Sequence, residues 1–237
     1  MSKMLPEAST DGLLLIIPAR GGSKGIPGKN VRNLAGRPLI AHTIAFARDL
    51  GLLERTIVST DSALIADVSR EAGASVPFLR PEELARDDTP MLPVLQHAVQ
   101  HAIQKGWRPD LVVLLQPTAP FRRPADLLAA LQSFEDEDVD SVVSVERVPD
   151  HFSPHYVMRI QDGRLAPYLS EGSRVTRRQD APPAYTRNGQ FYVTRTKCLM
   201  EGNSIYGTRC LPFVTMHPAA NLDTLEDWAE AEKLMGA

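Results

Sequence analysis

The sequence is poor in cysteine, with only Cys198 and Cys210 among 237 residues. Two thiols are too few for a disulfide framework or a cysteine-rich zinc site, so they favour a reducing compartment. The start, MSKMLPEASTDG, has one lysine and no apolar stretch after it, which is not the pattern of a secretory signal. We therefore expect a cytoplasmic protein in which residues 1–12 form a flexible tail.

Long apolar runs and a strong net charge are also missing. No run approaches the roughly 18 residues of a membrane span, so no membrane partner is expected. The formal net charge of −3 does not indicate a nucleic-acid surface. Any site for an anionic ligand must therefore be a local one.

Apolar runs alternate with helical patterns along the chain. The runs expected to form strands are 13–19, 55–60, 74–80, 111–115, 139–148, 189–195 and 211–215, and the expected helices are 38–51, 61–73, 91–106, 124–136 and 221–235. This alternation predicts one α/β domain over residues 13–237, with a mostly parallel sheet and helices on both faces. Ligands of such sheets bind beyond the carboxyl ends of the strands.

The alternation of strand and helix patterns breaks off over residues 146–187, which we therefore interpret as an insertion. The stretch HYVMRIQDGRLAPYL resembles a hairpin that turns at Asp162-Gly163. The α/β pattern resumes after it, so it is not expected to be a separate domain. Its apolar residues need a surface to cover them, because an isolated two-stranded ribbon is marginal in water.

The loop PARGGSKGIPGKN, residues 18–30, directly follows the first apolar run. Its glycines let a ligand approach the backbone, and its N–H groups can surround an anion. Ser23 stands where a Walker A motif needs glycine, and no register fits G-x-G-x-x-G. The loop therefore predicts a phosphate site of another kind, with Arg20 and Lys29 neutralising charge.

Two aspartates lie at the starts of predicted helices, and each has two interpretations. Asp223 is either a helix cap or a ligand for Mg²⁺ with Asn221 beside it, and the residues alone do not decide. For Asp61, capping is the favoured interpretation. Arg174, Arg177 and Arg178 form either a solvated basic face or a site for a carboxylate or phosphate.

The glycine loop resembles the nucleotide-binding signature of the acylneuraminate cytidylyltransferases, also called CMP-sialic acid synthetases. Further blocks resemble the same family in the same order: RTIVSTDS, RPEELARD, LLQPTAPFR, RRQDAPPAYTRNGQFYV and NLDTLEDWAEAE. The resemblance implies a Rossmann-like nucleotidyltransferase fold and a homodimer formed through the insertion. It also implies transfer of CMP from CTP, the co-substrate, to a nine-carbon sugar acid.

The resemblance also implies roles for individual residues. The residues expected to bind CTP are Arg20, Gly21, Gly22, Ser23, Lys29, Asn30 and Arg80, and those expected on the sugar side are Gln116, Arg178, Gln179, Asn188 and Tyr192. Asp223 matches the family's ligand for Mg²⁺, which Mn²⁺ can replace. Arg20, Lys29 and Asp223 are the expected catalytic residues.

The chain departs from the family pattern at two places. Asn221 stands where the family commonly has the first aspartate of Asp-x-Asp, which leaves the number of metal ions open. Thr186 follows Tyr185 where many relatives have arginine, so Arg187 receives no role. The natural sugar and any general base also stay open, as do two rivals: a cytidylyltransferase for KDO and a CTP-binding regulator without turnover.

Overall fold

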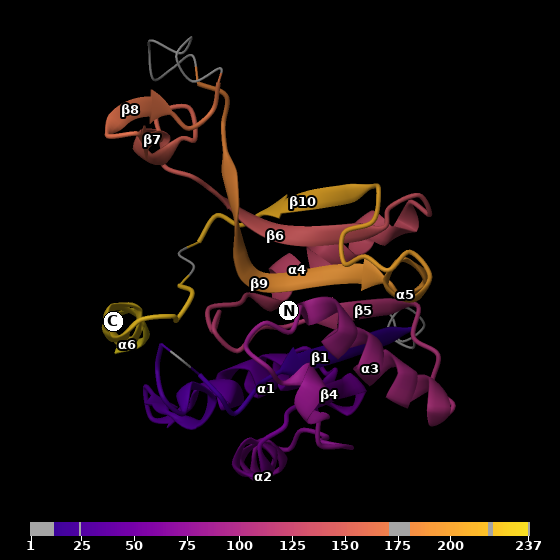
Figure 1. Ribbon diagram of the computed structural model, residues 1–237. Coiled ribbons are helices and arrows are strands. Elements are labelled where there is room, and N and C mark those ends of the chain that lie inside the picture. The colour runs from indigo at the N-terminus through magenta and orange to yellow at the C-terminus, as the bar shows by residue number, and fades with distance from the viewer. Residues whose placement is uncertain (1–11, 24, 171–180, 218–219, 237) are drawn as a thin grey trace.

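The computed structural model of the protein describes residues 12–23, 25–170, 181–217 and 220–236, and its centre is a six-stranded sheet (Figure 1). In sequence order the strands are β1 (Leu13–Pro18), β4 (Thr56–Ser59), β5 (Leu111–Leu114), β6 (Ser141–Arg147), β9 (Tyr185–Arg195) and β10 (Cys210–Val214). In space the order is β10-β6-β9-β5-β1-β4. Only β9 runs antiparallel to its neighbours in this sheet, β5 and β6. The predicted mostly parallel α/β sheet is confirmed.

Helices cover both faces of the sheet, as predicted. One face packs against α1 (Leu39–Asp49), α2 (Ala63–Glu71) and α4 (Pro124–Gln132), and the other against α3 (Met91–Gln104) and α5 (Thr196–Met200). Along β1, Leu15 and Ile17 face the first set of helices and Ile16 faces the second. A strand buried on both faces needs apolar residues at every position, which explains the unbroken run. In the described part of the chain, no helix is long and apolar enough to cross a lipid bilayer.

One predicted strand is wrong. Residues 74–80 make only two isolated bridges, Ser75 with Ile57 and Leu79 with Thr60. Pro77 lies between the two bridges and has no N–H to donate to a ladder. In the described residues, the short elements that the sequence pattern did not predict are α5, the β2 (Asn33–Leu34) and β3 (Arg37–Pro38) hairpin, and the 3-10 turns at Lys29–Val31, Leu53–Arg55, Glu82–Leu84 and Asp150–Phe152. A further 3-10 turn, Ser133–Glu135, forms the end of the predicted helix 124–136.

The last helix, α6 (Leu225–Gly236), packs against the glycine loop rather than against the main sheet. A separate apolar cluster joins Ile26 of the loop to Leu222 and Trp228. Leu34 and Leu39 complete this cluster from the segment after the loop. Burial of these side chains draws the C-terminal segment against the loop, although nearly 200 residues separate them in the sequence.

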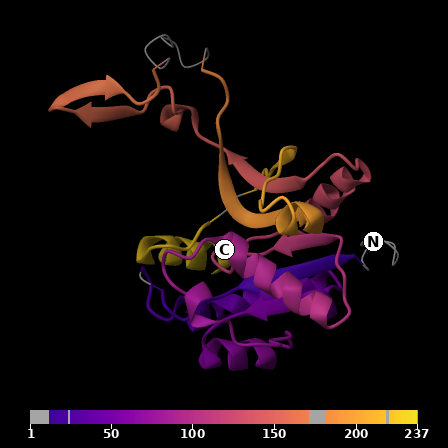
Figure 2. The same ribbon diagram turned by 45° about the vertical axis from the view of Figure 1, so that its right-hand side comes forward.

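The predicted insertion forms an arm that leaves the main sheet, here defined as the described residues in 148–184. Arg147 at the end of β6 pairs with Tyr185 at the start of β9, and the arm lies between them. The arm carries β7 (Met158–Gln161) and β8 (Arg164–Pro167), which among the described residues pair only with each other. The predicted hairpin turn at Asp162-Gly163 is confirmed. Figure 2 shows this hairpin standing clear of the body of the protein.

Candidate active site

A hollow of about 510 Å³ lies at the carboxyl edge of the parallel strands, between the glycine loop and the loop after β5. The predicted site residues that line it are Arg20, Ser23, Lys29, Asn30, Arg80, Gln116 and Asp223. Gly21 and Gly22 belong to the same loop. The hollow is therefore rich in cations and in hydrogen-bond donors, as a site for a nucleoside triphosphate requires.

Two side chains hold the backbone of the glycine loop in place: Asp61, which follows β4, and Asn30, at the end of the loop itself. Asp61 Oδ1 accepts the Gly21 N–H at 2.9 Å, and Asn30 Nδ2 donates to the Arg20 carbonyl at 3.1 Å. The predicted capping role of Asp61 is wrong, because Ser62 caps α2 by accepting the Ile65 N–H. Asp61 instead reaches across to the neighbouring loop, where it fixes one backbone donor.

Gly25 lets the loop touch the segment that carries Asp223. A Cβ at Gly25 would lie 2.4 Å from the Asp223 carbonyl oxygen, which no side chain could tolerate. This close approach requires glycine at position 25. It explains one of the four glycines of the loop by packing rather than by a ligand.

Lys29 and Asp223 form the central contact of the site. Lys29 Nζ lies 3.0 Å from Asp223 Oδ1 and donates to the Leu222 carbonyl at 2.7 Å. The Leu222 N–H in turn donates to the Thr118 carbonyl of the loop after β5 at 2.8 Å. Three segments distant in sequence thus meet at one cation, which both lines the hollow and orients the Asp223 carboxylate.

The structure separates Asp223 from the helix cap. Asp227 Oδ2 accepts the Thr224 N–H at 2.7 Å, and Thr224 Oγ1 accepts the Asp227 N–H at 3.1 Å. This reciprocal pair is a capping box that starts α6 at Thr224. The bond from the Thr224 backbone lowers the pKa of Asp227. The Asp223 side chain, 62% exposed, is therefore available to a ligand.

Asn221 turns its amide nitrogen, not its oxygen, toward Asp223. Asn221 Nδ2 donates to Asp223 Oδ2 at 2.7 Å. Among the described residues, no cluster of three or more acidic, histidine or cysteine side chains could hold a metal ion. One carboxylate does fit Mg²⁺ in a site of this kind, because the phosphates of a bound nucleotide supply further oxygens. The Asp223 carboxylate, which lines the hollow, meets this requirement.

A second ion pair lies across the hollow and was not predicted. Arg20 Nη1 lies 2.6 Å from Asp87 Oδ1, and Arg86 beside it also lines the hollow. Both residues belong to the block RPEELARD, from which only Arg80 was singled out. Arg86 and Asp87 come next to the glycine loop because residues 74–80 bridge to β4, and no local sequence pattern shows these bridges.

Arg80 lies at the floor of the hollow and is almost fully buried. Its Nε donates to Ser59 Oγ at 3.0 Å, and Nη2 donates to the Ser59 carbonyl. Burial lowers the pKa of Arg80 to about 10, so it stays cationic at neutral pH. Nη1 donates to the Leu84 carbonyl at 3.5 Å, and together these contacts fix the guanidinium beside the end of β4.

Gln116, which was predicted to lie on the sugar side, meets β9 at Gly189. A Cβ at Gly189 would lie 2.9 Å from Gln116 Oε1, and the Gly189 φ of 71° also favours glycine. Asn188 is buried, and its amide is used within the protein, by Thr215 Oγ1 and the Gln190 N–H. Tyr192 is buried beside Tyr206, and burial raises its pKa. Neither Asn188 nor Tyr192 lines the hollow, so the structure does not bring these two predicted sugar-side residues to it.

The two remaining residues that were predicted on the sugar side, Arg178 and Gln179, fall outside the described residues. His97 packs edge-on against Phe78 with ring centroids 4.6 Å apart, and burial lowers its pKa. His101 contacts the same ring, so the two histidines of α3 both pack against Phe78.

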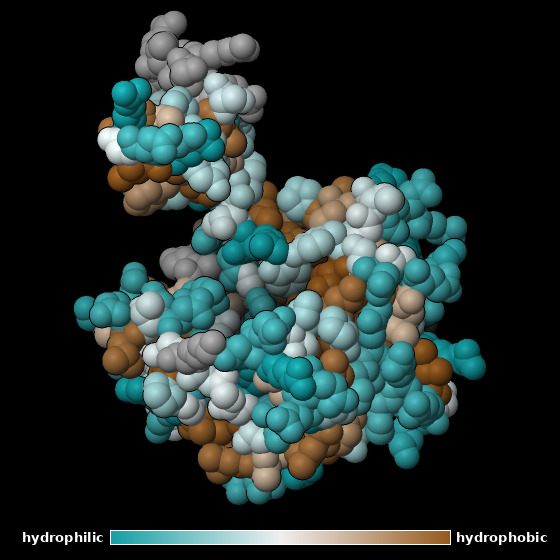
Figure 3. All heavy atoms as spheres, viewed as in Figure 1, coloured by the Kyte–Doolittle hydropathy of each residue, from teal (hydrophilic) through white to brown (hydrophobic). Residues whose placement is uncertain are grey.

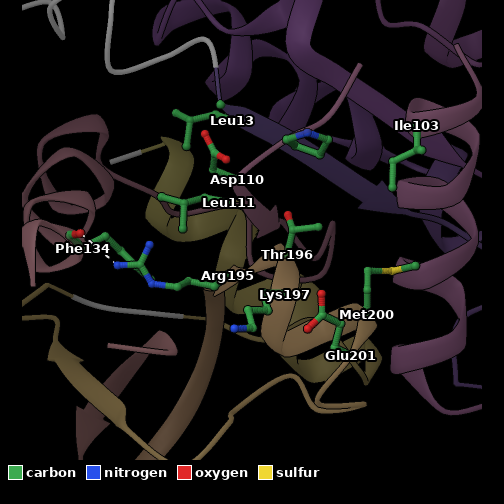
Figure 4. A pocket seen from close by; sticks show the side chains of 12 residues that line it. Leu13, Ile103, Asp110, Leu111, Phe134, Arg195, Thr196, Lys197, Met200 and Glu201 are labelled. Atoms are coloured by element: carbon green, nitrogen blue, oxygen red, sulfur yellow. Dashed lines mark hydrogen bonds between the residues drawn. The ribbon is translucent and has the colours of Figure 1, made fainter. Parts of the chain in front are cut away.

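A larger hollow, of about 720 Å³, opens at the opposite edge of the sheet (Figure 4). Arg195 and Lys197 both line it. Arg195 is turned toward the main chain, with Nη2 donating to the Phe134 carbonyl at 3.0 Å and Nε to the Val139 carbonyl at 2.8 Å. This edge carries the amino ends of the parallel strands, away from the glycine loop. Size alone therefore does not locate the active site, and we assign it to the smaller hollow.

Comparison with known proteins agrees with this geometry. A sequence profile described as cytidylyltransferase matches residues 14–233. CMP-N,N'-diacetyllegionaminic acid synthase of Legionella pneumophila is 39% identical over 94% of this chain and 96% of its own length. N-acylneuraminate cytidylyltransferase of Streptococcus agalactiae is 32% identical over 91% of this chain and 51% of its own length.

Solved structures show the same fold. A CMP:2-keto-3-deoxy-manno-octonic acid synthetase complexed with CTP superposes with a TM-score of 0.69, covering 94% of this chain and 98% of that one, at 17% identity. At this identity the likeness concerns the fold alone, and it confirms the predicted nucleotidyltransferase fold. The match of the profile over nearly the whole chain confirms the resemblance drawn from the motifs: the chain belongs to the cytidylyltransferase family.

Proposed function

We propose that this protein transfers CMP from CTP to the anomeric hydroxyl of a nonulosonic acid and releases pyrophosphate. The observation that carries the proposal is the meeting of Arg20, Lys29 and Asp223 around one hollow at the carboxyl edge of the sheet. Relatives named for the legionaminic, pseudaminic and acylneuraminic acid reactions match over most of this chain. The acceptor is therefore a nine-carbon sugar acid of one of these types.

The residues of the hollow suit the charges of this reaction. Phosphoryl-type transfer depends mainly on positioning and charge neutralisation. Arg20 and Lys29 offset charge on the triphosphate and the leaving pyrophosphate, and Arg80 lies where it can meet the base. Asp223 would hold Mg²⁺, which supplies Lewis-acid polarisation of phosphate oxygens when bound. Gln116 donates to the sugar acid, with Arg178 and Gln179 proposed on the same side.

A substrate panel tests the proposal. Pyrophosphate release from CTP is measured with legionaminic, pseudaminic and N-acetylneuraminic acids and with KDO. We expect release with at least one nonulosonic acid and little with KDO. Release with KDO alone would favour the eight-carbon rival, while tight CTP binding without release on any acid would favour a regulator. Either outcome contradicts the proposal.

Gln116→Ala tests the sugar side separately. Loss of a hydrogen bond to a charged substrate costs roughly 1.5–3 kcal/mol of binding free energy. This cost corresponds to a roughly 10- to 100-fold rise in KM for the sugar acid. The KM for CTP is expected to change by less than about 3-fold, because Lys29, Arg20 and Arg80 stay in place. Steady-state kinetics with each substrate varied in turn measures the split. Equal changes in KM for the sugar acid and KM for CTP would show that Gln116 does not contact the sugar acid specifically.

We also propose that two copies pair through the arm, as the family resemblance implied. Ile160 lies opposite Leu165 across the hairpin, and the two are 79% and 72% exposed. Met158 and Pro167 lie on the same face of the hairpin, since strand residues two apart point the same way. Figure 3 shows apolar side chains gathered on the arm, away from the body. A second copy is the partner that would cover this face.

Light scattering tests the pairing. The full chain is expected to be a dimer, and Ile160→Glu with Leu165→Glu is expected to give monomers, because two charges would have to be buried in the interface. Gln161→Glu is the matched control, since Gln161 lies on the other face of the hairpin and should leave the dimer intact. A monomeric, fully active wild-type chain would contradict the proposal.

A further inference from the structure

Arg122 joins three segments behind the sugar side of the site. It lies in the loop between β5 and α4, six residues after Gln116. Its Nη2 donates to the Gln116 carbonyl, its Nε donates to the Gln190 carbonyl of β9, and its Nη1 donates to Thr43 Oγ1 of α1 at 3.0 Å. The Arg122 guanidinium thus fixes the loop after β5, strand β9 and helix α1 relative to one another.

The contacts of Arg122 are not those of a salt bridge. No carboxylate of the described residues pairs with it, whereas Arg20 has Asp87. Burial lowers the pKa of Arg122 to about 9, which leaves it cationic at neutral pH. Arg122 is partly buried, and its guanidinium also lies over the Phe46 ring, 5.8 Å from the ring centroid. A cation in such a position without an ion-pair partner is not explained by stability alone.

The Gln116 side chain packs closely against β9, so its position depends on how the loop after β5 sits against that strand. Gln116 Oε1 lies within contact distance of Gly189, the neighbour of the residue whose carbonyl Arg122 binds. The same guanidinium therefore holds the backbone on both sides of this contact. A shift of the loop against β9 would move Gln116 out of reach of a ligand in the hollow.

We propose that Arg122 is a positioning residue for the sugar-acid half of the reaction, acting through Gln116. The proposal rests on the function proposed above, in which Gln116 contacts the sugar acid. Lysine cannot replace Arg122, because a single ammonium on a flexible stem does not span three acceptors in one plane. The nucleotide half of the site lies on the glycine loop and Arg80, which Arg122 does not contact.

The test compares Arg122→Lys with Thr43→Val in the full chain. Arg122→Lys keeps the charge and is expected to raise KM for the sugar acid 10- to 100-fold, as misplacement of a contact by about 1 Å does. KM for CTP is expected to stay within about 2-fold of wild type. Thr43→Val removes only the acceptor on α1, so it is expected to lower the Tm and leave both KM values unchanged.

Three outcomes would overturn the inference: equal shifts in both KM values, no shift in either, or the same shift in Thr43→Val. Gln116→Ala separates this inference from the proposed function. If Gln116→Ala leaves KM for the sugar acid unchanged, the function assigned to Gln116 is wrong. If Gln116→Ala raises this KM and Arg122→Lys does not, the positioning role of Arg122 is wrong. Should Arg122→Lys not fold, Gly189→Ala decides, because its Cβ displaces Gln116 directly. An unchanged sugar KM in Gly189→Ala would then overturn the inference.

Discussion

Replacing Asp223 by asparagine is expected to lower kcat/KM about 1000-fold, or roughly 4 kcal/mol of transition-state stabilisation. The variant keeps the shape of the side chain and removes its charge. The exposed Asp223 carboxylate lines the hollow, and Lys29 Nζ lies 3.0 Å from its Oδ1. Pyrophosphate release at a series of Mg²⁺ concentrations measures the effect, and the remaining activity is expected to depend only weakly on Mg²⁺.

Thr224→Ala is the matched control for Asp223→Asn, because it removes the cap of α6 from the adjacent residue. Loss of such a cap costs about 1 kcal/mol of stability and should spare turnover. The two variants therefore separate catalysis from helix capping at neighbouring positions. An Asp223→Asn enzyme with wild-type turnover and a lowered Tm would return Asp223 to a structural role.

Lys29→Ala is expected to lower kcat/KM for CTP by about 10²–10³-fold, which is typical for loss of one preorganised charge contact. The structure adds a second reason for this loss, since Lys29 also holds the Asp223 carboxylate and the Leu222 carbonyl. Steady-state kinetics with CTP varied measures the effect. The Tm is expected to fall as well, because the tie to Leu222 is lost.

The double variant Lys29→Ala/Asp223→Asn tests whether the two residues act as a unit. Groups that share one interaction lose less together than the sum of their separate losses. We expect the double variant to be about as slow as the slower single variant. Fully additive losses would show that Lys29 and Asp223 contribute independently, and near-normal kcat/KM in Lys29→Ala would contradict the phosphate site itself.

Local sequence determined much of the fold. The unbroken apolar run of β1 requires burial on both faces, and the alternation of strands and helices requires a mostly parallel sheet, so both could be predicted. The pattern failed at residues 74–80, where Pro77 interrupts an otherwise strand-like run. It also could not show that β9 runs antiparallel between β5 and β6, because strand direction depends on partners chosen across the whole chain.

The chemistry of the glycine loop was also determined by local sequence, since glycines, cations and the preceding strand are adjacent there. The partners of that loop were decided only by the tertiary structure. Asp223 could be a cap or a ligand until Thr224 and Asp227 were seen to form the cap. Lys29 meets Asp223 because the cluster of Ile26, Leu222 and Trp228 buries the two segments together. Burial of apolar area is not directional, so the sequence marks these residues as apolar without saying which of them will meet.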